Sequence, residues 1–307
     1  MADHQDPATL YVDCDTGVDD AVAIGLLLAT GAARIAGIGT VSGNTSAAQA
    51  AANTLDLLAL AGRDDIPVAV GAHRDDFTGG AEVVHGDNGI GGVRLPAARR
   101  APAAEDAVGL LLRLSREHAG TLHVLATGPA TNLARALDRD PALPGRVAAV
   151  TVMGGAVRAP GNVTPYAEAN IAGDPVAAAA VLAAPWPVTL VPLDVTLNHR
   201  FTEADQADLR AGGALPRALG DMLGTYFDYY APQFGMRASP IHDALAAGVA
   251  TGLLPLGDAP ELGLRVDTGD GPERGRVAED PGAATRTRVV FSLARPAAPI
   301  IKAALLA

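Results

Sequence analysis

The chain has 307 residues, of which 49% are hydrophobic and only 4% aromatic; this composition suits a sheet of small aliphatic side chains covered by helices on both faces. Its net charge of -11 argues against a surface for nucleic acid or an anionic membrane, and a single cysteine excludes an internal disulfide. The N-terminal residues lack the basic and apolar segments of a signal peptide, and no apolar run reaches the ~20 residues that span a bilayer. We therefore expect a cytoplasmic protein.

Four carboxylates follow the first predicted strand. Residues 10–12 indicate a buried strand, and residues 21–29 indicate a helix that Gly31 ends. Between these two elements lie Asp13, Asp15, Asp19 and Asp20. Open α/β sheets bind ligands at such strand-to-helix turns. Four like charges this close repel one another unless a cation neutralises them, and their oxygen atoms suit calcium or magnesium. The alternative is a solvated acidic turn that caps the helix, for which one or two acids are enough.

Strand and helix patterns alternate along the rest of the chain. Further strands are predicted at residues 34–41, 67–70, 121–125, 147–153 and 188–191, and helices at residues 46–60, 106–115, 215–230 and 243–250. Late strands at 264–266 and 287–292 are expected to be antiparallel at a sheet edge, and residues 72–93 and 267–286 are expected to be loops. This order predicts a single α/β domain over residues 1–307, with a mostly parallel, Rossmann-like sheet, helices on both faces and a more helical second half.

Several polar residues directly follow predicted strands. They are Asp15, Asn44, Thr127, Asn162, Glu168 and Asn170. Because the carboxyl ends of parallel strands share one edge of a sheet, these side chains are expected to meet there and form an active site. Taken singly, Asn44 and Asn162 are also compatible with ordinary turns.

Two histidines are further candidates. His242 precedes Asp243 at the start of a predicted helix, although an Asp at that position is also a common helix cap. His85 lies in a Gly-rich loop that does not match a phosphate-binding loop. Lys302 is the only lysine of the chain, which excludes a mechanism that needs an internal lysine nucleophile or phosphate clamp.

The motifs together resemble one known family. The segment DCDTGVDDA at 13–21 is similar to the DxDxGxDD signature of the nucleoside hydrolases, the inosine-uridine-preferring N-ribohydrolases. The resemblance continues through TVSGN, HGDNGIGG, LATGPATN, AEANIAGDP and the HDA at 242–244, in the same order. Thr16 stands where the family commonly has Pro, a difference that affects the rigidity of the turn more than its chemistry.

This resemblance implies a function and a role for each motif residue. It implies hydrolysis of ribonucleosides to free base and ribose, one bound Ca²⁺, and a homo-oligomer, either a dimer or a tetramer. The implied metal ligands are Asp15, Asp20, Asp243 and the carbonyl of Thr127. The ribose diol would be held by Asp19 and Asn170, and the 5′-hydroxyl by Asn162 and Glu168. Asp15 would be the general base, Asn44 would orient the water, His242 would be the candidate acid, and His85 would contact the base. Asp13 would fix its neighbours.

Two other functions remain open at this point. One is a catalytically silent nucleoside-binding protein on the same scaffold, which binding without turnover would reveal. The other is a Mg²⁺-dependent phosphatase of the haloacid-dehalogenase type, which also begins with DxD after its first strand. That family needs a lysine to hold the phosphoryl group, and Lys302 is poorly placed for this near the C-terminus.

Overall fold

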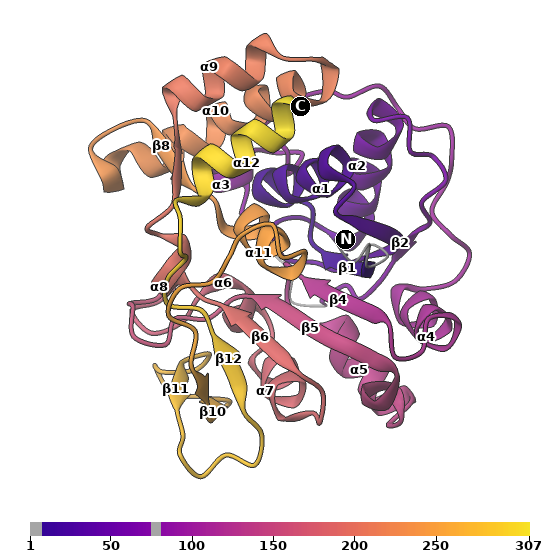
Figure 1. Ribbon diagram of the computed structural model, residues 1–307, viewed down its shortest axis with the longest axis vertical. Helices are drawn as coiled ribbons and strands as arrows, with labels where there is room; N and C mark the ends of the chain where they lie inside the picture. The colour runs from indigo at the N-terminus through magenta and orange to yellow at the C-terminus, as the bar shows by residue number, and fades with distance from the viewer. Residues whose placement is uncertain (1–7, 75–80) are drawn as a thin grey trace, which may run out of the picture.

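An eight-stranded sheet forms the centre of the computed structural model, which describes residues 8–74 and 81–307 (Figure 1). Its strands, in spatial order, are β3 (Val68–Val70), β2 (Ala33–Thr40), β1 (Ala8–Cys14), β4 (Leu122–Ala126), β5 (Val147–Met153), β6 (Val188–Val191), β12 (Thr287–Val289) and β9 (Glu261–Leu262). Neighbouring strands are parallel except β9, which pairs antiparallel with β12 at one edge. This confirms the predicted α/β class with a mostly parallel sheet.

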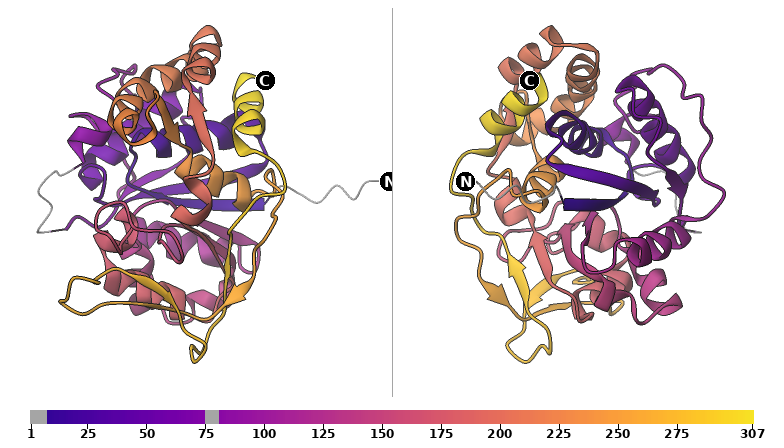
Figure 2. Two further views of the ribbon diagram at one scale, coloured as in Figure 1. Left: turned by 90° about the vertical axis from the view of Figure 1, so that its left-hand side faces the viewer. Right: turned by 45° about the vertical axis from the view of Figure 1, so that its right-hand side comes forward.

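Helices cover both faces of the sheet, and the views of Figure 2 show the same layers. One face carries α1 (Val18–Thr30), α2 (Ala47–Leu60), α10 (Ala214–Phe234), α11 (His242–Ala250) and α12 (Ala297–Leu306). The other face carries α4 (Ala107–Glu117), α5 (Thr131–Arg139) and α7 (Pro175–Ala183). Each face encloses its own apolar cluster, in keeping with strands that are buried on both sides.

Shorter elements lie around these layers. They are α3 (Glu82–His85), a 3₁₀ turn (Leu143–Arg146), α6 (Ala169–Gly173), α8 (Leu193–Thr196) and α9 (Glu203–Ala211). Two small antiparallel pairs join β7 (Arg200–Thr202) to β8 (Ala238–Pro240), and β10 (Leu264–Val266) to β11 (Val277–Glu279). None of the helices in the described part of the chain is long and apolar enough to cross a membrane.

The last third of the chain departs from the sequence prediction. The strand predicted at 287–292 ends at Val289; it pairs antiparallel with the edge strand β9, as expected, but its other neighbour is β6, to which it is parallel. The strand predicted at 264–266 pairs antiparallel with β11, as expected, but outside the main sheet. The expected loop at 267–286 contains β11, and the expected loop at 72–93 contains α3, while 75–80 lie outside the described residues. These segments are three or four residues long, and tertiary contacts rather than local pattern decide the structure of such short segments.

Strand β1 determines where the acidic turn lies. It runs between β2 and β4, and its residues from Leu10 to Cys14 are all buried. Because β1 is central and parallel to both neighbours, its carboxyl end opens at the middle of the sheet edge. Cys14 is in register with Thr40, and Asp13 with Ala126. The segments that follow β1, β2 and β4 therefore begin side by side, as predicted. Together they form the rim of the sheet, the edge at which the carboxyl ends of its parallel strands lie.

Candidate active site

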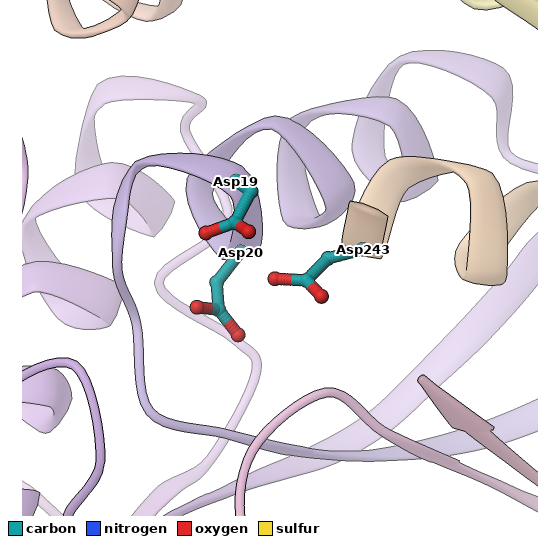
Figure 3. Close-up of side chains that lie close together, drawn as sticks. All are labelled: Asp19, Asp20 and Asp243. Carbon is teal, nitrogen blue, oxygen red and sulfur yellow. The ribbon is translucent and has the colours of Figure 1, made fainter. Parts of the chain in front are cut away.

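Three carboxylates from two helices converge above this edge (Figure 3). Asp19 and Asp20 lie in the first turn of α1, and Asp243 lies in the first turn of α11. One oxygen atom of each carboxylate lies within 4.8 Å of the others, a spacing that could hold a metal ion. Asp20 is oriented by hydrogen bonds to both of its oxygens, because Oδ2 accepts the N–H of Gly17 at 2.8 Å and Oδ1 accepts the hydroxyl of Thr127 at 2.7 Å.

Asp15 lies beside this group without being one of the three. Its Oδ2 accepts the backbone N–H of Asn44 at 2.7 Å, and the side-chain amide of Asn44 donates to Asp20 at 3.2 Å. The chain of the β2 turn passes so close that a Cβ on Gly43 would lie 1.9 Å from Asp15 Oδ2, so only glycine fits there. The structure thus brings Asn44 to the two carboxylates that the sequence placed on the neighbouring turn.

The pKa values of these carboxyl groups are raised. Burial is the largest cause for Asp15, Asp19, Asp20 and Asp243, and it raises the pKa of Asp20 to about 6. Repulsion from neighbouring carboxylates raises the pKa of Asp15 and Asp243 further. Buried like charges of this kind are costly unless a cation compensates them.

Two buried oxygen atoms are left for a ligand. Within the described residues, Oδ1 of Asp15 and Oδ1 of Asp19 have no hydrogen-bond partner, although both atoms are buried. Native proteins leave few such atoms unpaired, and each one calls for an explanation. Unpaired oxygens amid clustered carboxylates suit a hard cation such as calcium, which takes six to eight oxygen ligands. The residues present therefore fit a metal ion.

Asp13 is held beneath the cluster by neutral partners. The hydroxyl of Tyr11 donates to it at 2.9 Å, and Nδ2 of Asn132 donates to both of its oxygens at 3.1 and 3.2 Å. Burial raises the pKa of Asp13 to about 7, although these hydrogen bonds oppose the shift. Asn132 also donates to the carbonyl of Thr40 and accepts the N–H of Ala72, so it joins three segments of the rim. The only sequence signal for this role is a polar residue at the buried start of α5.

We expect the substitution Asn132→Ala to lower the free energy of unfolding by about 3 kcal/mol, because the buried Asp13 keeps only its bond from Tyr11 and two buried backbone groups lose their bonds to Asn132. Urea unfolding followed by circular dichroism measures the change. The exposed Asn198, whose amide donates to a single backbone carbonyl, provides the control Asn198→Ala, with an expected loss below about 1 kcal/mol. Equal losses in both variants would contradict the role assigned to Asn132.

The segment after β5 brings three predicted residues to the same rim. Glu168 caps α6 and accepts the N–H groups of Asn170, Ile171 and Gly155 at 2.9, 3.1 and 2.9 Å. The side-chain amide of Asn170 donates to the carbonyls of Thr127 and Met153. Oδ1 of the exposed Asn162 accepts the N–H of Ala169 at 3.0 Å. Asn170 is thereby joined directly to Thr127, the residue that follows β4.

His85 lies against the opposite side of the cluster. Its Nδ1 accepts the N–H of Val18 at 3.1 Å and lies 3.8 Å from Oδ1 of Asp19. Burial lowers the pKa of His85 to about 4, although the charge of Asp20 raises it. The imidazole is therefore neutral at pH 7, with its proton on Nε2, because Nδ1 acts as an acceptor. Tyr226 completes this side: its hydroxyl donates to Asp19 at 2.9 Å and its ring lies 5.2 Å from that of His85.

His242 lies next to Asp243 but bonds to other partners. Its Nδ1 lies 2.8 Å from the hydroxyl of Thr196, and its Nε2 lies 3.3 Å from the hydroxyl of Tyr230. Burial, followed by repulsion from His85, lowers the pKa of His242 to about 3. At pH 7 this imidazole is neutral, so it carries a single N–H proton. Because both ring nitrogens face a hydroxyl group, any proton that His242 gives to a ligand must be one that it shares with Tyr230 or Thr196.

Known proteins match the chain over most of its length. Residues 10–298 match the family described as inosine-uridine preferring nucleoside hydrolase. Uridine nucleosidase 1 of Arabidopsis thaliana is 36% identical over 242 residues, which cover 77% of this chain and 72% of the relative. The pyrimidine-specific ribonucleoside hydrolase RihA of Salmonella typhi is 37% identical over 240 residues, or 76% of each chain.

Solved structures share the whole fold. A plant nucleoside hydrolase superposes with a TM-score of 0.91 at 28% identity, covering 98% of this chain and 99% of its own. A purine-preferring ribonucleoside hydrolase from Gardnerella vaginalis superposes with a TM-score of 0.90 at 30% identity, covering 97% of this chain and 98% of its own. Sequence and structure comparisons thus point to the same group of enzymes.

Proposed function

Because the chain belongs to the inosine-uridine preferring nucleoside hydrolase family, whose members hydrolyse ribonucleosides, we propose that it does so with Asp15 as general base and a calcium ion in the acidic site. In this reaction water attacks C1′ of the ribose, the N-glycosidic bond breaks, and free base and ribose leave. The observation that carries the proposal is the group formed by Asp19, Asp20 and Asp243, with the unpaired oxygen of Asp15 beside it.

The proposed metal ligands are Asp15, Asp20, Asp243 and the backbone carbonyl of Thr127. The position of Asp19 in the three-carboxylate group supports a place for it at the metal as well as at the ribose diol. When bound, calcium supplies positive charge that offsets the carboxylates, orients the ribose hydroxyls and makes nearby water more acidic. The choice of calcium over magnesium rests on the number of oxygen atoms and on the irregular geometry that calcium tolerates.

Asp15 would remove the proton of the attacking water through Oδ1. Its other oxygen is held by the N–H of Asn44, so the carboxylate keeps one orientation while it acts. Asn44 would orient the water from the adjacent turn. As the bond to the base breaks, C1′ becomes cationic, as in glycoside hydrolysis in general. The surrounding carboxylates stabilise that charge.

The ribose would be held by residues from three segments. Asp19 and Asn170 bind the 2′- and 3′-hydroxyls, and Asn162 and Glu168 bind the 5′-hydroxyl. The amide of Asn170 already donates to two carbonyls, which leaves its oxygen free to accept from a hydroxyl. The leaving base would take its proton from the linked pair His242 and Tyr230, with His85 as a further contact to the base.

Uridine is the first substrate to test, because relatives named as uridine nucleosidase and as pyrimidine-specific hydrolase match the chain. The purified protein is incubated with uridine, cytidine, inosine, adenosine and guanosine, and free base and reducing sugar are quantified. We expect equal amounts of base and ribose from at least one nucleoside. A protein that binds nucleosides in equilibrium dialysis but releases no base would instead be the catalytically silent binder.

A further inference from the structure

The one-turn helix α8 anchors a segment far from it in the sequence. Asp194 on this helix accepts three consecutive backbone N–H groups: Val157 at 2.9 Å on Oδ2, and Arg158 and Ala159 at 2.7 and 3.0 Å on Oδ1. Hydrogen bonds to an ionised acceptor are about twice as strong as neutral ones. Both oxygens of one carboxylate are thus engaged in holding the start of a single loop.

That loop is the one that carries Asn162 and Glu168. Gly155, where it leaves β5, accepts the N–H of Leu193 at 2.9 Å, and its own N–H donates to Glu168 at 2.9 Å. The outer half of the loop is closed by its own bonds, since the N–H of Asn162 donates to the carbonyl of Ala167 at 3.2 Å. On its N-terminal side, the turn closed by Ala167 is therefore connected to the rest of the protein through residues 157–159, which Asp194 holds.

A second contact holds the outer face of the same segment. The guanidinium of Arg158 lies 3.9 Å from the ring centre of Phe291 and forms an ion pair with Glu279 at 3.0 Å. Both members of that ion pair are about half exposed, at 55% and 45%, and exposed pairs contribute little. Asp194 is less exposed than this pair, and it makes the stronger bonds. Asp194 is accordingly the main anchor of the segment 157–159.

We propose that Asp194 is a positioning residue for recognition of the 5′-hydroxyl of the nucleoside. It touches no substrate atom; it fixes the loop whose Asn162 and Glu168 meet that hydroxyl. The inference rests on the proposed function, since that function assigns the 5′-hydroxyl to these two residues. The hydrogen bonds from residues 157–159 to Asp194 are half-buried or exposed, so water can replace the carboxylate. Removal of Asp194 therefore loosens the loop and leaves the fold intact.

Kinetics with two substrates separates this role from a general loss of stability. For Asp194→Ala we expect the KM of uridine to rise about 10- to 100-fold, by analogy with the loss of residues that orient metal ligands from behind, with a smaller change in kcat. For 5′-deoxyuridine, which lacks the hydroxyl, kcat/KM should change less than about threefold. Asp194→Asn keeps one oxygen acceptor, so its KM for uridine should lie between those of wild type and Asp194→Ala.

Asp205→Ala is the matched control. Asp205 also accepts a backbone N–H, that of Thr202 at 2.9 Å, and pairs with Lys302 at 2.8 Å, but it lies on α9. Removal of the Asp205 carboxylate should leave the ratio of kcat/KM for uridine to kcat/KM for 5′-deoxyuridine unchanged. If Asp194→Ala loses equally in kcat/KM on both substrates, or loses on neither, the proposal is wrong. It is also wrong if the wild-type enzyme has the same kcat/KM for uridine and 5′-deoxyuridine.

Hydrogen exchange provides a readout that does not depend on turnover. In Asp194→Ala the amides of residues 157–159 should exchange at least about tenfold faster than in wild type, while Asp205→Ala leaves them unchanged. A wild-type protein inactive on every nucleoside would contradict the proposed function, and exchange alone would then decide whether Asp194 anchors the loop. Unchanged exchange at 157–159 would refute the anchor even in an active enzyme.

Discussion

The variant Asp15→Asn is expected to lose about 10²- to 10⁴-fold in kcat, the range that a general base contributes, while it keeps its fold. The amide can still accept the N–H of Asn44 through its oxygen, but it presents an NH₂ group where Oδ1 has no partner. That group cannot take a proton from water. Because the pKa of Asp15 is raised by burial and by Asp20, loss of this charge should not destabilise the fold.

Initial rates of base release with saturating uridine measure the effect, and circular dichroism verifies the fold. Asp65→Asn is a suitable control, since Asp65 is an exposed carboxylate that pairs with Arg63; its kcat should equal that of wild type. Near-normal turnover by a correctly folded Asp15→Asn protein would refute Asp15 as the base. A loss in kcat with unchanged calcium affinity would assign the effect to proton removal rather than to metal binding.

Removal of the metal is expected to abolish base release and to destabilise the protein. Asp15, Asp20 and Asp243 are buried, and burial together with mutual repulsion raises their pKa values, so their charged forms are unfavourable in the metal-free site. A ligand that binds only the folded state stabilises it by about 4 kcal/mol when present at a thousandfold excess over its Kd. We therefore expect calcium to raise the unfolding temperature of the chelated protein by several degrees and to restore activity.

Scanning calorimetry of the chelated protein, with and without added calcium, measures this stabilisation independently of activity. Asp243→Asn should reduce the calcium-induced shift, because one member of the three-carboxylate group is lost, whereas the exposed control Asp65→Asn should show the full shift. Magnesium added in place of calcium should give a smaller shift, since it prefers strict octahedral geometry. Full activity after exhaustive chelation would refute the proposal that the reaction requires a bound metal ion.

The rim of the sheet was predictable because a single rule governs it. Alternating strands and helices imply parallel strands, and parallel strands place their carboxyl ends at one edge. Asp15, Asn44 and Thr127 follow three such strands, and the structure joins all three to Asp20 or to one another by hydrogen bonds. No knowledge of the packing was needed to bring them together.

Other parts of the site depend on packing that no local pattern encodes. The sequence did not indicate that Asp19, rather than Asp15, shares the closest carboxylate group with Asp20 and Asp243, because this depends on how α1 and α11 pack. In the sequence, Asn132 was only the last residue of the LATGPATN segment, yet in the structure it supports Asp13. The neutral state of His242 depends on burial against Thr196 and Tyr230, which come from two other helices.

The amino-acid sequence by itself therefore determined the α/β class, the edge that carries the site and most of its polar residues, because those follow from short-range periodicity and strand direction. Only the tertiary structure decided the pairing of the late strands β9 to β12, the direction in which burial shifts the pKa of the site's carboxyl groups and histidines, and the anchoring of the 157–159 segment by Asp194. These features depend on which distant segments exclude water from one another, and that is settled only when the whole core packs.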